Sequence, residues 1–131
     1  MTVVEKEYDL NSNSNPYPHL YTTADYYETI VTKIRRESIL LRMTTNLDII
    51  IFCGSDILSA LVHCNSYVSK SNYNSFDGVE FVGYLFGDKV YYDINLGYNT
   101  VLIGTDYNEI KYYNIKKERK EKLKKIKRYE I

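Results

Sequence analysis

His63 and Cys64 are adjacent, and a histidine next to a cysteine could supply a base and a nucleophile. Neighbours on a helix point about 100° apart, whereas a working pair normally meets across the fold. A buried structural thiol beside a helix-end histidine is therefore the favoured interpretation. A metal site of His19, Cys53, His63 and Cys64 would need a loop, a strand and a helix to converge, and the cysteines lack metal-ligand spacing. We predict no catalytic residues, no metal and no cofactor.

Carboxylates and glycines give a second set of candidates for chemistry. Local turn hydrogen bonds account for the aspartates that could otherwise form a paired-carboxylate or cation site, because Asp favours turn positions. Gly83 and Gly87 frame the sequence GYLFG, but no Gly-Lys-Ser/Thr is present and no helix is expected to follow, so it is not a phosphate loop. We therefore expect that the chain is not an enzyme. The aspartates in question are Asp77, Asp88, Asp93 and Asp106.

The charge distribution is the strongest feature of the composition. The chain has 17 basic and 17 acidic residues, so its formal net charge is zero. Residues 116–131 hold nine basic and three acidic side chains, which leaves a body of net charge −6 and a tail of net charge +6. A basic tail could follow a phosphate backbone or bind an acidic protein, although two acids are interleaved with its cations and terminal charge runs are usually solvated. Its candidate contact residues are Lys116, Lys117, Arg119, Lys120, Lys124, Lys125, Lys127 and Arg128.

Length and apolar content indicate one domain with a single core. A chain of 131 residues is long enough for this, and its fifteen Tyr residues suit protein–protein contact because the ring adds area at low entropy cost. The longest apolar run, 49–53, is far shorter than the ~20 residues of a membrane helix. No apolar run follows a basic start, so we expect no secretion signal and no membrane contact.

The first half of the chain predicts an arm, a helix, a strand and a second helix. Residues 1–21 are rich in Asn, Ser and Pro, which favours an extended arm. Apolar spacing predicts a long helix from Thr22, as its cap, to about Met43. The run 48–53 is β-branched and predicts a strand covered on both faces. Ser55 is expected to cap a short helix at 56–64.

The second half predicts a long loop, a hairpin, two strands and a tail. Residues 65–78 form the loop, and 79–86 and 89–93 form a hairpin whose turn is Gly87-Asp88. Residues 100–104 predict a strand, and the period-two alternation of 109–115 predicts another. The domain is thus expected at 22–115, and 116–131 forms a basic helical tail. The predicted fold is α+β: a central mixed or antiparallel sheet flanked by one long and one short helix.

The order of these elements resembles the C-terminal half of tailed-phage major capsid proteins of the Hong Kong 97-type fold. The matching segments are NLDIIIFCGSDILSAL at 46–61, GVEFVGYLFGDKVYYD at 78–93 and TVLIG at 100–104. In that family a peripheral-domain helix leads into a strand and short helix, and a later hairpin precedes a strand of the axial domain. A complete capsid protein is normally longer, with an extended loop and a long spine helix.

The resemblance implies a virion or capsid-related structural protein that self-associates or docks in a shell. It places the protein in the virion or the host cytoplasm, not outside the cell. The expected partners are further copies or other capsid proteins, and the alternative is a small adaptor whose basic tail binds nucleic acid or an acidic protein. By motif order the loops at 65–77 and 94–99 face neighbours. Their candidate contact residues are Tyr67, Tyr73, Phe76 and Tyr98.

Overall fold

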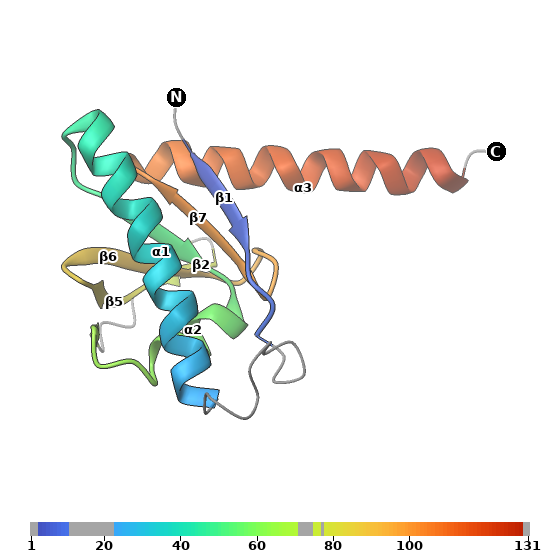
Figure 1. Cartoon of the computed structure of the whole chain (residues 1–131). Helices are drawn as coiled ribbons and strands as arrows, with labels where there is room; N and C mark the ends of the chain where they lie inside the picture. The colour runs from blue at the N-terminus through green and yellow to red at the C-terminus, as the bar shows by residue number, and fades with distance from the viewer. Residues whose placement is uncertain (1–2, 11–22, 71–74, 77, 130–131) are drawn as a thin grey trace.

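A seven-stranded mixed sheet forms the centre of the molecule (Figure 1). The computed structural model describes residues 3–10, 23–70, 75–76 and 78–129. The strand order is β1-β7-β2-β6-β5-β3, and the short β4 also pairs with β5. Strands β2 and β6 are parallel, and the other pairs are antiparallel. The predicted α+β fold with a mixed sheet is confirmed. The strands are β1 (Val4–Glu7), β2 (Ile50–Cys53), β3 (Tyr67–Ser69), β4 (Ser75–Phe76), β5 (Val79–Leu85), β6 (Asp88–Asp93) and β7 (Thr100–Gly104).

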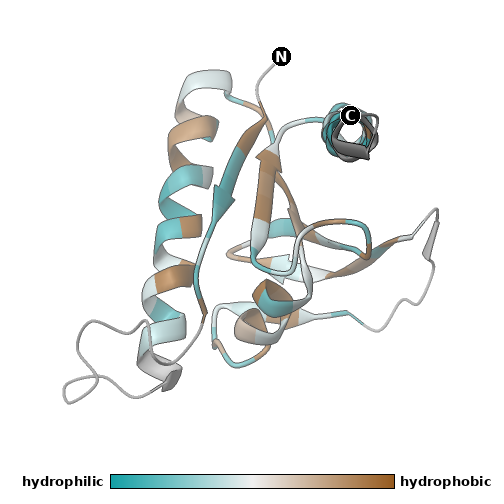
Figure 2. Ribbon diagram, turned by 90° about the vertical axis from the view of Figure 1, so that its right-hand side faces the viewer, coloured by the Kyte–Doolittle hydropathy of each residue, from teal (hydrophilic) through white to brown (hydrophobic). Residues whose placement is uncertain are grey.

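Helices cover both faces of this sheet (Figure 2). Helices α1 (Thr23–Thr45) and α2 (Ser55–Leu61) pack on one face, where Ile34, Ile51 and Ile103 are fully buried. The first turns of α3 (Tyr107–Tyr129) cover the other face, where Phe52, Leu102 and Ile110 form a second core. Successive residues of a strand point to opposite faces, so the apolar run at 50–53 supplies both cores. This explains why β2 is apolar throughout.

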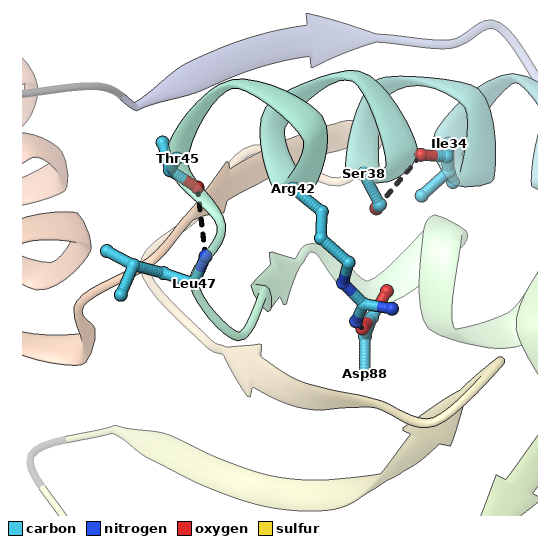
Figure 3. A network of polar contacts seen from close by, with 6 residues as sticks. All are labelled: Ile34, Ser38, Arg42, Thr45, Leu47 and Asp88. Atoms are coloured by element: carbon cyan, nitrogen blue, oxygen red, sulfur yellow. Dashed lines mark hydrogen bonds and ion pairs between the residues drawn. The ribbon is translucent and has the colours of Figure 1, made fainter.

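Helix α1 begins and ends close to its predicted limits, with Thr22 outside the described residues. Its last residue is followed by Asn46, which adopts φ 57° and donates its N–H to the Arg42 carbonyl at 2.7 Å. Such a left-handed residue is a common helix C-terminus. Buried Ser38, which interrupts the apolar stripe, donates its hydroxyl to the Ile34 carbonyl at 3.1 Å (Figure 3). The polar atom is therefore satisfied inside the helix.

The predicted strand at 109–115 is wrong, because these residues form the start of α3. Asp106 Oδ1 accepts a hydrogen bond from the Glu109 N–H at 3.0 Å, which is a side-chain cap on the helix N-terminus. Ile110, Asn114 and Lys117 then contact the body at helical spacing. Some apolar residues of this segment do alternate with polar ones, but the Asp106 cap and the helical spacing of the buried residues determine its structure. The described part of the chain therefore contains two long helices and one short helix.

Three smaller predictions also need correction. The long loop at 65–78 contains β3 and β4, both paired with β5. The hairpin turn is Phe86-Gly87, whose φ angles of 51° and 85° suit a two-residue hairpin turn with positive φ at both central residues. Asp88 is therefore the first residue of β6 and not part of the turn. Ser55 makes no side-chain cap on α2, whose N-cap is Gly54.

The ends of the chain differ from the expected arm and tail. Val4–Glu7 is an edge strand that pairs with β7, so part of the expected arm belongs to the sheet. The expected boundary between domain and tail, at 115/116, falls inside α3, which continues without a break to Tyr129. Figure 1 shows α3 extending well beyond the sheet.

Candidate functional site

Cys64 and His63 do not form a nucleophile–base pair. The Cys64 thiol donates to the Ala60 carbonyl at 3.3 Å, and the His63 ring stacks on Tyr27 with centroids 6.2 Å apart. Burial, together with a smaller contribution from the nearby Glu28 carboxylate, raises the pKa of Cys64 to about 11. Burial likewise raises the pKa of the enclosed Cys53 thiol to about 12. Both groups therefore remain protonated thiols, which are poor nucleophiles.

No metal site is found among the residues that the structure describes. None of their His, Cys, Asp and Glu side chains form a group of three that could hold an ion. His19, one of the four candidate ligands, lies outside the described residues. Cys53 and Cys64 are both free and buried in the core beneath α1.

Two of the turn aspartates make the local hydrogen bonds predicted for them. Asp93 Oδ1 accepts from the Asn95 N–H at 2.9 Å, and its Oδ2 accepts from Asn114 Nδ2 at 2.8 Å, which fixes α3 to the end of β6. Asp106 caps α3. Asp77 lies outside the described residues.

Asp88 does not have the predicted turn role. The residue is only 7% exposed, and its carboxylate pairs with Arg42 of α1 (Figure 3). Burial raises the pKa of Asp88, and the Arg42 charge opposes that rise without cancelling it. The pair joins the end of α1 to the β5–β6 hairpin, which is a structural role.

Backbone N–H groups at the start of α2 are bonded within the fold, although the helix follows a strand and a glycine. The N–H groups of Asp56 and Ile57 donate to the Tyr98 carbonyl, at 2.8 and 3.3 Å. The Gly54 N–H donates to the Thr100 carbonyl at 3.0 Å. Loop 94–99 therefore lies across the end of α2 and is fixed there by backbone hydrogen bonds.

The aromatic residues proposed for contact have different environments in the structure. Tyr98 is 75% exposed in the fixed loop and can contact a partner. Tyr67 instead belongs to β3, and its hydroxyl donates to the Val82 carbonyl at 2.5 Å. Tyr73 lies outside the described residues, and Phe76 is described only as part of β4.

The basic residues proposed for contact lie along α3. Lys117 pairs with Glu5 of β1, and the Lys116 ammonium lies 4.9 Å from the centre of the Tyr112 ring. Arg119, Lys120 and Lys124 are exposed. Lys125, Lys127 and Arg128 belong to α3, but their side chains lie outside the described part of the chain.

Helix α3 has an inner face on the body and an outer face turned away from it. The inner face includes Ile110, Asn114 and Lys117, with Glu118 and Glu121 following along the same side. The outer face carries what we call the outer stripe, at spacings of three and four residues, which place side chains in one row. Its members are Tyr112 (53% exposed), Ile115, Arg119 and Leu123 (57% exposed). The sequence prediction missed this stripe because it assigned 109–115 to a strand.

An acidic cleft of about 270 Å³ lies between the end of β1, loop 94–99 and the inner face of α3. The acids Glu7, Glu118 and Glu121 line it together with Tyr98. Lys117 also lines the cleft, but its ammonium is paired with Glu5. A neighbouring cleft of about 350 Å³, lined by Asp56 and Tyr27, shares Asn99 with it. This side of the body therefore presents carboxylates beside an exposed tyrosine.

Comparison with protein-family models, with curated proteins and with solved structures finds no match. The resemblance to the capsid family thus rests on the sequence segments themselves. None of the helices in the described part of the chain is long and apolar enough to cross a membrane.

Proposed function

We propose that this chain is a non-catalytic structural protein of a virus particle, related to the axial domain of Hong Kong 97-type capsid proteins. It acts by associating with further copies or by docking to other capsid proteins. Its place of action is the virion or the host cytoplasm.

The exposed, backbone-fixed loop at 94–99 is the observation that carries this proposal. A rigid loop with an exposed tyrosine loses little freedom on binding, and Tyr is enriched in interfaces. Tyr98 meets both conditions, because it is 75% exposed while its carbonyl oxygen accepts two N–H groups of α2. The arrangement of the three resembling segments also supports the proposal. They contribute β2, β5, β6 and β7, which are consecutive in the sheet order β7-β2-β6-β5.

Light scattering on the purified chain over a wide concentration range, in low and high salt, tests self-association. We expect species larger than the monomer, and Tyr98→Ser is expected to weaken their formation by about fivefold or more. Val68→Ser is a matched control, because Val68 is 56% exposed on β3 at the far edge of the sheet. A strict monomer under all conditions would contradict self-association.

A small adaptor that binds nucleic acid is the second candidate, favoured by the extension of basic α3 beyond the sheet (Figure 1). Binding of this kind weakens steeply with salt, because each neutralised phosphate releases counterions. The triple variant Arg119→Gln/Lys120→Gln/Lys124→Gln should reduce the slope of log affinity against log salt by about 2 to 3 on duplex DNA. Unchanged DNA binding by this variant, or no binding by the parent chain, would remove this candidate.

A further inference from the structure

The outer stripe of α3 is an unpartnered helix face with a mixed apolar and basic character. Tyr112, Ile115 and Leu123 supply exposed apolar surface, and Arg119 lies between them. Lys116 and Lys120 lie beside the stripe, and both are exposed. An apolar row bordered by cations is the form in which a helix docks on an acidic groove.

The acidic cleft has the complementary character. Glu7, Glu118 and Glu121 supply the carboxylates, and Tyr98 supplies exposed aromatic surface at its rim. Complementary charges steer encounter and fix the register of a contact, while the apolar groups at its centre supply most of the affinity. The outer stripe and the acidic cleft thus match in both charge and apolar surface.

These two surfaces cannot meet within one chain. Glu118 and Glu121 lie on the inner side of α3, whereas Tyr112, Arg119 and Leu123 lie on its outer side. Since α3 is one continuous helix, its outer side always faces away from its own acidic cleft. A contact between the two surfaces must therefore join two molecules.

We propose that the outer stripe of one copy docks in the acidic cleft of the next copy, so that the chains associate head to tail. This inference rests on the proposed self-association and names the two surfaces that carry it. The contact joins different patches, so it is heterologous and closes into a ring or continues as a filament. Each added copy leaves one free stripe and one free cleft.

A second copy is the occupant because charge complementarity selects it. The acidic cleft holds Glu7, Glu118 and Glu121, whereas Arg119 lies in the outer stripe with exposed Lys116 and Lys120 beside it, so a head-to-tail contact brings opposite charges together. Pairing two outer stripes would instead bring Lys116, Arg119 and Lys120 of each copy together, and like charges in contact are unfavourable. A nucleic acid would bind the cations of this helix face but would leave the exposed apolar side chain of Leu123 without a partner.

Two double variants separate the two surfaces. Arg119→Glu/Leu123→Gln damages the outer stripe, and Glu7→Lys/Glu121→Lys damages the acidic cleft. Arg36→Glu/Leu40→Gln is a matched control on α1, because it makes the same changes at the same four-residue spacing, and Leu40 is 50% exposed. Sedimentation velocity of the full chain at low and high salt measures association.

We expect each damaged variant alone to associate at least about tenfold more weakly than the parent, while the control variant associates like the parent. An equimolar mixture of the two damaged variants should form a dimer and nothing larger, because only one intact stripe and one intact cleft remain. This outcome would distinguish a head-to-tail contact from a symmetric one, in which the mixture would gain nothing.

Three results would overturn the inference. Undiminished association of the stripe variant, with an associating parent, would leave the proposed self-association intact and assign it to another surface. Equal weakening by the control would show a general effect of charge and exposed apolar surface. A parent that stays monomeric while the stripe variant loses DNA binding would contradict both self-association and this contact.

Discussion

The hydroxyl of Tyr113 donates a hydrogen bond of 2.7 Å to Glu5 Oε2, which joins the last helix to the first strand across 108 residues. The Lys117 ammonium pairs with the other oxygen of the same carboxylate. One side chain on an edge strand therefore holds two successive turns of α3. Together with the bond from Asn114 to Asp93, this contact holds the first turns of α3 on the body, beside the acidic cleft.

Glu5→Gln should make the free energy of unfolding fall less steeply as pH decreases. Burial raises the pKa of Glu5, but the hydrogen bonds from Lys117 and Tyr113 outweigh it, so the pKa lies below its ordinary value. Because the pKa of Glu5 is lower in the folded state, the unfolded chain binds this proton first as pH falls. The stabilisation that Glu5 provides is therefore complete above the unfolded pKa and is lost as pH falls through the folded pKa. Urea unfolding between about pH 3 and 7 measures it. Glu7→Gln controls for the loss of one carboxylate on the same strand, and an equal effect there would contradict a specific role of Glu5.

Asp88→Asn should have the opposite effect on how the free energy of unfolding depends on acid pH. Burial raises the pKa of Asp88 despite the Arg42 charge, so the native state binds this proton before the unfolded chain does. The free energy of unfolding therefore gains from Asp88 as pH falls through its folded pKa, and Asn removes that gain. We expect the variant to lose stability more steeply on acidification than the parent. A shallower profile would mean that the pair with Arg42 outweighs burial.

Asp106, which caps α3 in the structure, and Ser55, which was predicted to cap α2, should respond differently to alanine. Asp106→Ala removes the hydrogen bond to the Glu109 N–H and should lower the free energy of unfolding by about 0.5–2 kcal/mol. Ser55→Ala should change it by less than about 0.5 kcal/mol, because Ser55 makes no cap on α2. Chemical denaturation of both variants measures the difference. Equal losses would contradict the assignment of Gly54 as the N-cap.

The comparison of Asp106 and Ser55 also shows what the sequence could predict. Long periodic segments such as α1 and continuous apolar runs such as β2 were predicted correctly, because burial on one or both faces leaves a local pattern. The start of α3 was not predicted, since Ile110 and Tyr112 alternate with polar residues as in a strand. The helix is instead selected by the Asp106 cap and by contacts to Glu5, which is distant in sequence. The Asp106-x-x-Glu109 pattern was the available signal.

The acidic cleft could not be predicted from any local pattern. Its carboxylates come from β1 and α3, at opposite ends of the chain, and only the pairing of β1 with β7 brings them together. Tyr98 was predicted as a contact residue from its loop, whereas Tyr67, chosen on the same ground, lies in a strand with its hydroxyl bonded to the backbone. The structure therefore distinguishes Tyr98 from Tyr67, although the sequence offers the same reason for choosing both.

Gly54→Ala should destabilise the protein and release loop 94–99. A Cβ at residue 54 would lie 1.9 Å from the Gly97 carbonyl oxygen, which is backbone and cannot rotate away. Either β2 or the loop must move, and such overpacking costs about 1–3 kcal/mol or more. Denaturation measures the loss, and faster hydrogen exchange at the Asp56 and Ile57 amides should report the broken bonds to Tyr98. Wild-type stability and exchange in this variant would show that the two segments are not in contact.

Both cysteines should resist thiol reagents until the chain unfolds. Burial raises the pKa of Cys53 to about 12 and that of Cys64 to about 11, so the reactive thiolate is scarce at pH 8 and the sulfur atoms are enclosed. Their reaction with a disulfide reagent at pH 8 should therefore be at least about tenfold slower than in urea-unfolded chain, where the pKa returns to about 8.5. Cys64→Ser and Cys53→Ser separate the two rates. Rapid reaction of native Cys64 alone would reveal an accessible thiol beside His63 and would reopen the nucleophile interpretation that its geometry argues against.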